Sequence, residues 1–349
     1  MVVGRKGARR PYRTGDETLD AKIAELVDAA TDAGGDDLLR EMLTTCVRVV
    51  RDKADRGEMK LVNAALKEFA YAFKVFKRYR GVRKVSIFGS SRSRPDDAEY
   101  ETTRRFARTM AERGWMVITG AGPGIMEAGH EGAGVERSFG AAIRLPMEVE
   151  PNVVIEGDPK LINFKYFFTR KVTFLKESDA FAMMPGGFGT LDEAFELLTL
   201  MQTGKSDLHP VVLLDTEGGR YWTEWRRFVD GNLLRRGLIS PEDMDMVLIT
   251  DSIDEAVAEL EDFYRNYHSQ RFVDGTLVLR LQRLPDERAL AALSDEFADI
   301  LRSSALRPVP PSDAEVEEDD HVELPRVALD FNARSHGRLR HLIDALNRC

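Results

Sequence analysis

The feature of this 349-residue chain that most constrains its fold is a series of short, wholly apolar runs that alternate with helical patterns. Runs without polar alternation are typical of strands buried on both faces, and their alternation with helices indicates a parallel sheet covered on both sides. The expected strands are VSIF (85–88), WMVIT (115–119), FGAAI (139–143), AFAMM (180–184), PVVLLD (210–215) and a weaker VLIT (247–250). The expected helices cover about 95–113, 123–134, 164–179, 189–204, 221–236 and 253–267. We therefore predict an α/β fold with a doubly wound, parallel, Rossmann-like sheet over residues 82–267.

The segments on either side of this region have different patterns. Residues 1–81 combine a basic tail with apolar residues at helical spacing over 17–80, which predicts a helical segment. Residues 268–349 contain two further strand patterns and two helical ones, which predicts a C-terminal α+β extension. Between them, Asp313–Asp320 holds six acidic residues, and such a charge run indicates a solvated, flexible linker.

Composition excludes several classes of protein. The 50 Lys and Arg against 59 Asp and Glu give a formal net charge of -9, which argues against a general nucleic-acid binder. No apolar run is long enough to span a membrane, and the basic start lacks the apolar region of a secretory signal. Two cysteines cannot form a disulfide framework, so we expect a cytoplasmic protein. The six histidines show no paired ligand spacing, and we expect no metal site.

Three glycine-containing turns each follow an expected strand. In an open α/β sheet, ligands bind beyond the carboxyl ends of the strands, and glycine allows the backbone to approach them closely. A helix that starts at such a turn also offers free N–H groups to a phosphate. A P-loop NTPase is excluded, because no GxxxxGK[ST] motif is present. The turns contain Gly89-Ser90-Ser91, Gly120-Ala121-Gly122-Pro123-Gly124 and Pro185-Gly186-Gly187-Phe188-Gly189-Thr190.

Charged residues flank the third turn. Glu193 lies in the first turn of the following helix, where an acid either compensates the helix dipole or faces whatever binds the turn. Arg170 and Lys171 lie on the preceding helix, where such a pair is either solvated or directed at the same site. Asp192 is a weaker candidate than Glu193 for a functional carboxylate.

Together these residues resemble the LOG ("lonely guy") family of cytokinin riboside 5'-monophosphate phosphoribohydrolases. The family signature is an Arg-Lys pair on a helix followed by PGGxGTxxE, which here spans Pro185 to Glu193. The Gly120–Gly124 turn is also similar, although Ala121 stands where the family commonly has glycine. Leu145-Pro146, Glu148 and Asn152 look like the longer bacterial members, which have often been labelled lysine decarboxylases. The sequence itself offers no support for a pyridoxal-phosphate site.

The resemblance implies hydrolysis of the N-glycosidic bond of a nucleoside 5'-monophosphate, without a cofactor, to give the free base and ribose 5-phosphate. Arg170 and Glu193 would then be catalytic, and the family implies a homodimer or higher oligomer. The expected substrate-binding residues are Gly89, Ser90, Gly120, Gly122, Gly124, Met126, Glu148, Lys171, Gly186, Gly187, Phe188, Gly189, Thr190, Asp192 and Thr199.

Other functions remain open at this stage. A non-hydrolytic nucleotide sensor or a molybdenum-cofactor carrier could use the same sheet, although the presence of both Arg170 and Glu193 favours the enzyme. The helices of 17–80 and the C-terminal extension could have a regulatory or assembly role. The sequence does not choose between AMP, GMP and a cytokinin precursor.

Overall fold

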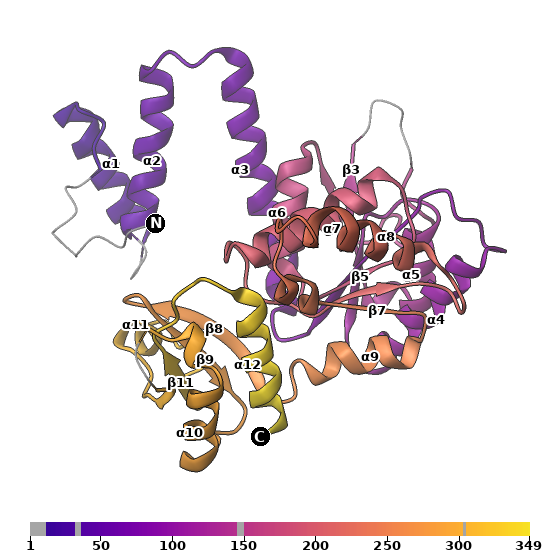
Figure 1. Ribbon diagram of the computed structural model, residues 1–349. Helices are drawn as coiled ribbons and strands as arrows, with labels where there is room; N and C mark the ends of the chain where they lie inside the picture. The colour runs from indigo at the N-terminus through magenta and orange to yellow at the C-terminus, as the bar shows by residue number, and fades with distance from the viewer. Residues whose placement is uncertain (1–11, 32–35, 145–149, 303–304) are drawn as a thin grey trace. The chain divides into compact units, whose positions relative to one another are not determined.

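The computed structural model describes residues 12–31, 36–144, 150–302 and 305–349 (Figure 1). The chain divides into two compact units, residues 1–70 and 71–349, and helix α3 passes from one to the other. The domain boundaries expected at residues 81 and 267 therefore remain predictions.

The N-terminal unit is helical, as expected. The Asp16 carboxylate caps α1 by accepting from the N–H groups of Thr18 and Leu19, and α1 packs on α2 with Ile23 and Val27 buried. The helices are α1 (Glu17–Ala30), α2 (Asp36–Arg51) and α3 (Arg56–Phe76).

The larger unit is built on a seven-stranded sheet with the order β4-β3-β2-β1-β5-β6-β7, and every neighbouring pair is parallel. Because β1 lies between β2 and β5, the strand order reverses at β1, and a crevice is expected at such a reversal. The strands are β1 (Lys84–Phe88), β2 (Met116–Thr119), β3 (Ser138–Ile143), β4 (Leu161–Phe164), β5 (Ala180–Met183), β6 (Val211–Leu214) and β7 (Val247–Thr250).

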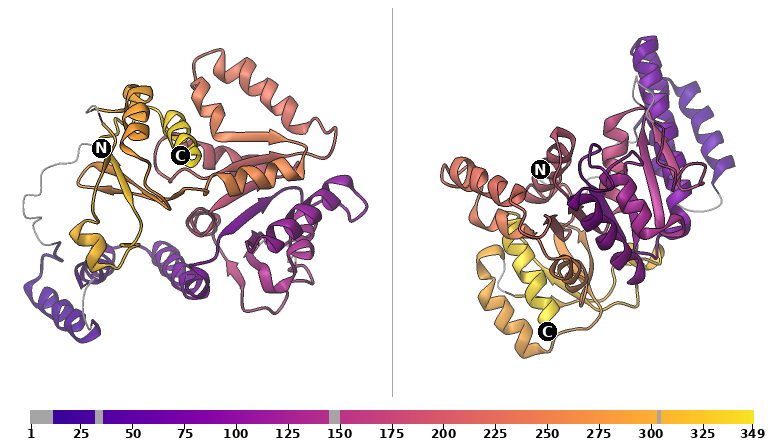
Figure 2. Two further views of the ribbon diagram at one scale, coloured as in Figure 1. Left: turned by 90° about the horizontal axis from the view of Figure 1, so that it is seen from below. Right: turned by 90° about the vertical axis from the view of Figure 1, so that its right-hand side faces the viewer.

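Helices cover both faces of this sheet (Figure 2). Successive strand residues face opposite sides, so that Ile87 and Val117 belong to one apolar cluster with residues of α4, α5 and α9, whereas Phe88 and Ile118 belong to another with residues of α6, α7 and α8. The predicted doubly wound α/β fold is confirmed. The helices are α4 (Ala98–Glu112), α5 (Ile125–Ala133), α6 (Phe167–Glu177), α7 (Phe188–Gln202), α8 (Tyr221–Val229) and α9 (Ile253–Asp262).

Two elements within this region differ from the prediction. Leu161–Phe164 forms the edge strand β4, which was not predicted, because the sequence pattern placed Phe164 at the start of a helix; a four-residue run that contains the polar Asn163 does not distinguish a strand from a helix start. The helix expected over 221–236 ends at Val229 and continues as a π-helical turn, Asp230–Leu234.

The C-terminal extension forms an antiparallel sheet of order β10-β11-β9-β8. The β8–β9 turn places Asp274 and Gly275 at positive φ, the conformation of a tight hairpin turn. The elements are β8 (Tyr267–Val273), β9 (Thr276–Leu281), α10 (Glu287–Glu296), β10 (Arg307–Pro308), α11 (Asp313–Glu317), β11 (Arg326–Leu329) and α12 (His336–Arg348). Within the described residues, no helix is both long and apolar enough to cross a membrane.

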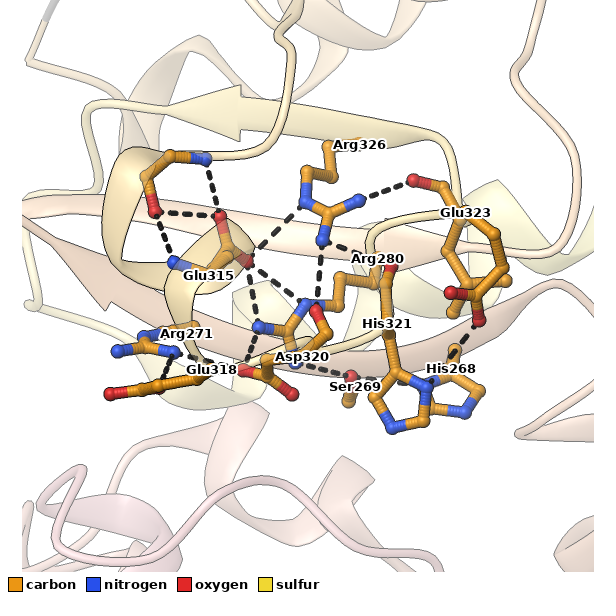
Figure 3. A network of polar contacts seen from close by, with 12 residues as sticks. His268, Ser269, Arg271, Arg280, Glu315, Glu318, Asp320, His321, Glu323 and Arg326 are labelled. Carbon is orange, nitrogen blue, oxygen red and sulfur yellow. Dashed lines mark hydrogen bonds and ion pairs between the residues drawn. The ribbon is translucent and has the colours of Figure 1, made fainter. Parts of the chain in front are cut away.

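The expectation of a solvated, flexible acidic linker is met only in part: Asp313, Glu317, Glu318 and Asp319 are exposed, but the run is neither unstructured nor wholly solvated. Residues 313–317 form helix α11, and its Glu315 lies beside Arg280 and Arg326 (Figure 3). Glu315 is only 1% exposed. Its carboxylate accepts from Arg280 at 2.7 Å and from Arg326 at 3.3 Å, and both arginines are buried. Burial alone raises the pKa of Glu315, but hydrogen bonds from Ser312 and Arg280 outweigh it and lower that pKa to about 2. The acidic run thus supplies a buried partner for two arginines of the sheet.

Candidate functional site

The three glycine turns come together at the carboxyl ends of β2, β1 and β5, which are neighbours in the sheet. Backbone hydrogen bonds join them: the Ser90 N–H donates to Pro185 O at 3.1 Å, and the Ile125 N–H donates to Ser90 O at 3.0 Å. The Gly89-Ser90 turn therefore ties the PGGFGT turn to the start of α5. A cavity of about 910 Å³ lies over these turns.

Most of the expected site residues line this cavity. They are Gly89, Ser90, Gly120, Gly122, Met126, Arg170, Gly186, Gly187, Phe188, Gly189, Thr190, Asp192 and Glu193. Three other expected residues do not line the cavity. Gly124 has φ +70° and packs against the backbone of Ser90 and Ser91. Lys171 pairs with Glu193, and Thr199 is exposed. Glu148 is outside the described residues. What each residue binds stays a prediction.

The PGGFGT turn, residues 185–190, is arranged like an anion cradle. Gly187 precedes the first turn of α7, no side chain of the described residues caps that end, and Thr190 and Leu191 donate their N–H groups back to Gly187 O. The N–H groups of Phe188 and Gly189 therefore remain for a ligand. A Cβ on Gly187 would meet no protein atom within 4 Å, so this glycine borders open space.

Tyr221 supports the cradle from α8. Its hydroxyl donates to Gly186 O at 2.6 Å, which fixes the orientation of the peptide that leads into Gly187. Sequence reasoning missed Tyr221, because a contact across 35 residues has no characteristic spacing.

Arg170 extends from α6 into the cavity. Its Nε–H donates to Ala141 O at 2.8 Å, and its guanidinium carbon lies 5.3 Å from the centre of the Phe174 ring. A Cβ on Gly120 would lie 2.3 Å from Arg170 Nη2, so the guanidinium packs on a position that only glycine can provide. Burial lowers the pKa of Arg170, and the Glu193 carboxylate opposes that effect.

Glu193 projects from α7 into the same cavity, with its side chain only 14% exposed. Burial raises the pKa of Glu193, while the charges of Lys171 and then Arg170 oppose the rise. Lys171 Nζ lies 3.5 Å from Glu193, 2.8 Å from Asp192 and 2.5 Å from Glu196. Lys171 therefore acts on the cavity through the carboxylates it holds.

Several cavity residues were not expected from the sequence. Phe167 lies one turn before Arg170 on α6, and Arg92 follows the first glycine turn, to which Ser91 already belongs. Extending those two motifs would have found Phe167 and Arg92. The cavity is also lined by residues that come just before and just after Glu148 in the chain, namely Ala142, Ile143, Glu150 and Pro151. Within the described residues, no three His, Cys, Asp or Glu side chains are grouped so as to hold a metal.

Comparison with known proteins gives consistent similarities. A family model described as "Possible lysine decarboxylase" matches residues 120–260. The cytokinin riboside 5'-monophosphate phosphoribohydrolase LOG1 of Arabidopsis thaliana is 40% identical over 94 residues, which is 27% of this chain and only 42% of that protein. The molybdenum cofactor binding protein of Rippkaea orientalis aligns in structure with a TM-score of 0.37 at 18% identity, covering 52% of this chain and 96% of that one.

A bacterial relative is matched over most of its length. The cytokinin riboside 5'-monophosphate phosphoribohydrolase of Mycobacterium tuberculosis is 30% identical over 165 residues, which is 47% of this chain and 86% of that protein. The match therefore extends over nearly the whole relative, and the PGGxGTxxE signature and the Arg-Lys pair are both present. This chain belongs to the LOG family.

Proposed function

We propose that this protein hydrolyses the N-glycosidic bond of nucleoside 5'-monophosphates, giving the free base and ribose 5-phosphate. The observation that carries the proposal is that one cavity holds an uncapped helix N-terminus, a guanidinium and a largely buried carboxylate, supplied by the PGGFGT turn, Arg170 and Glu193. Membership of the LOG family supports the same activity.

The 5'-phosphate would bind at the PGGFGT turn. The N–H groups of Phe188 and Gly189 and the positive end of the α7 dipole suit a phosphate dianion, and the Thr190 hydroxyl adds a donor. Since Gly187 and Gly189 have no side chains and border open space, the phosphate can approach the backbone directly. Binding therefore requires no basic protein overall, which is compatible with the net charge of -9.

Glu193 would act on the ribose. As the bond between C1' and the base nitrogen breaks, its electron pair leaves with the base and C1' acquires oxocarbenium character. An ionised Glu193 stabilises this positive charge and accepts a proton from the attacking water, whose oxygen forms the new bond to C1'. The departing base takes up a proton from solvent and Glu193 releases the proton of the attacking water to solvent, so that one water is consumed and the carboxylate is ionised again.

Arg170 would assist the leaving group. Its guanidinium is held by Ala141 O and packed on Gly120, and it is therefore oriented before substrate binds. A fixed cation beside a base that accumulates negative charge lowers the energy of the transition state more than that of the ground state. Arg170 also favours the ionised form of Glu193.

The substrate is AMP, GMP or a cytokinin riboside monophosphate in this proposal, and the protein acts without a cofactor. We also propose a cytoplasmic homo-oligomer, at least a dimer, in keeping with the family. The two exposed cysteines, Cys46 and Cys349, are both unpaired, which is compatible with a reducing compartment.

The direct test is to incubate the purified chain with AMP, GMP and isopentenyl-AMP and to measure the free base by chromatography. We expect base and ribose 5-phosphate in equal amounts from the wild type, and loss of turnover in Glu193→Ala. Glu136→Gln, on an exposed 3-10 turn, is the matched control and should retain wild-type rates. Release of intact nucleotide or cofactor from the purified protein, with no base formed from any substrate, would support a carrier instead.

A further inference from the structure

The turn between β2 and α5 contains an unusual backbone conformation. Ala121 has φ +62°, in the left-handed region that residues with a Cβ rarely adopt, and it is 1% exposed. The glycines on either side of it, Gly120 and Gly122, do not have positive φ. Surrounding contacts must therefore hold Ala121 in this conformation.

Asn152, which does not itself line the cavity, makes two of these contacts. Its N–H donates to Ala121 O at 2.8 Å, and its Nδ2 donates to Gly122 O at 3.0 Å. The third contact is local, because the Ala121 N–H donates to Thr119 Oγ1 at 3.0 Å. Asn152 is 6% exposed, so that its hydrogen bonds have little competition from water.

His130 on α5 fixes the Asn152 side chain. His130 Nδ1 lies 3.2 Å from Asn152 Oδ1, and Nε2 lies 3.0 Å from both Phe139 O and Thr119 Oγ1. His130 is fully buried, and burial lowers its pKa, while its contacts with Asn152 and Phe139 O oppose that effect. The amide of Asn152 is therefore oriented before it meets the turn.

The position of this turn matters because Arg170 packs on it. A Cβ on Gly120 would lie 2.3 Å from Arg170 Nη2, so the backbone of Gly120 is in contact with the guanidinium. If Ala121 relaxed to negative φ, the preceding peptide would rotate and Gly120 would move. The guanidinium would then lose the surface that orients it.

We infer that Asn152 is a positioning residue, which holds Ala121 in the left-handed conformation and thereby sets the place of Arg170. The inference rests on the proposed function insofar as Arg170 acts in catalysis. Asn152 does not line the cavity and acts only through the turn.

Four proteins test this: the wild type, Asn152→Ala, Ala121→Gly and the double variant. Asn152→Ala keeps the backbone bond to Ala121 O and removes the bond from Nδ2 to Gly122 O, and we expect this loss to lower kcat with AMP by about tenfold, as for a displacement of a catalytic group by under about 1 Å. KM should change less, because the PGGFGT turn is not in contact with Asn152. The double variant should recover much of kcat, since glycine adopts positive φ without help.

Asn347→Ala is the matched control. Asn347 is also 6% exposed and hydrogen-bonds the backbone of Asn266, Tyr267 and Phe263, far from the turn. Its removal should lower the Tm, and Ala121→Gly should give no recovery of kcat in that background. If Asn152→Ala keeps wild-type kcat, or if Ala121→Gly does not improve it, the inference is overturned.

The Tm of the same four proteins tests the inference about Ala121 without any measurement of activity. Ala121→Gly should raise the Tm of the wild type by relieving the left-handed alanine, and should raise it less in the Asn152→Ala background, where the turn has already relaxed. Equal shifts in both backgrounds would show that Asn152 does not hold Ala121. Absence of turnover in the wild type would refute the proposed function alone, and the Tm comparison would still decide the inference about the turn.

Discussion

Replacing Lys171 by methionine should move the acid limb of the pH–rate profile to higher pH. Lys171 does not line the cavity, but its ammonium lies 3.5 Å from the Glu193 carboxylate. Burial raises the pKa of Glu193, and Lys171 is the strongest of the charges that oppose this rise. Methionine has a similar length and shape without the charge, so the change removes an electrostatic contact with little loss of packing.

The size of the effect follows from the distance. Two unit charges 3.5 Å apart interact by about 5 kcal/mol at an effective dielectric constant of 20 and by about 1 kcal/mol in bulk water. The two side chains are 13% and 14% exposed, which places the interaction between these limits. Because about 1.4 kcal/mol corresponds to one pH unit, the limb should move by about one unit or more.

The direction is fixed by the role proposed for Glu193. If the ionised carboxylate is the active form, activity falls as the pH drops through its pKa, and removing the cation makes that fall begin at higher pH. Asp192 and Glu196 lose the same partner, and their uncompensated charges further disfavour ionisation of Glu193. At pH values well above the limb, the variant should approach the wild-type rate.

The assay is kcat/KM for AMP between about pH 4 and pH 9, measured for the wild type, Lys171→Met and Lys176→Met. Lys176 lies on the same helix, is 47% exposed and pairs with Glu177, so its removal controls for a general loss of charge on α6. The reasoning is refuted if the limb of Lys171→Met stays in place or moves to lower pH. It is refuted equally if Lys176→Met shifts the limb as far.

Four further results are expected. Glu315→Gln should lower the free energy of unfolding in urea at pH 7 by about 3 kcal/mol, because it removes the buried carboxylate that Arg280 and Arg326 share; Arg280 keeps Asp320, and Arg326 keeps only carbonyl acceptors. The exposed Glu318→Gln should cost under about 1 kcal/mol. In the wild type, the contribution of Glu315 to the free energy of unfolding should be complete above pH 4.5 and lost between pH 4.5 and 2, because its pKa is 4.5 in the unfolded chain and about 2 in the folded one. A free energy of unfolding that stays constant over that pH range would contradict this. Gly120→Ala should lower kcat with AMP at least about tenfold, because the new Cβ displaces Arg170, and unchanged kinetics would show that the guanidinium position is not critical. Tyr221→Phe should raise KM for AMP by about fivefold or less, as expected for one hydrogen bond to the backbone of the PGGFGT turn, and should leave inhibition by free adenine unaltered.

The central strands were predictable because burial on both faces leaves a continuous apolar run, as in VVLL of β6, whose residues are all buried. Strand β4 at the edge has only four residues and alternates in exposure, so the same rule does not apply to it. Strand β8, Tyr267–Val273, carries the polar run His-Ser-Gln-Arg between apolar ends, and its pairing with β9 across a tight turn is what makes it a strand.

The site shows a similar division. The glycine turns that line the cavity were predicted from the residues themselves, because backbone approach and helix N-termini require glycine at short spacing, and Arg170 and Glu193 were predicted from the resemblance to the LOG signature. Asn152 and Tyr221 hydrogen-bond to carbonyls of the turns across 30 and 35 residues, and a carbonyl accepts from any donor that reaches it. Only the folded structure selects which donor that is.

Glu315 shows why the acidic composition of residues 313–320 did not reveal a buried ion pair in the C-terminal extension. A run of acidic residues is solvated unless the fold brings cations to it, and here β9 and β11 each place a buried arginine under α11. The same extension shares its core with the sheet, since Leu277 and Leu279 of β9 belong to one apolar cluster with Leu197 and Met201 of α7. Helix α7 therefore begins at the PGGFGT turn and ends against residues from the extension, where His336 Nδ1 lies 3.0 Å from Gln202 O. The change of sequence pattern near residue 268 marks the end of the parallel sheet, and the packing that supports α7 continues beyond it.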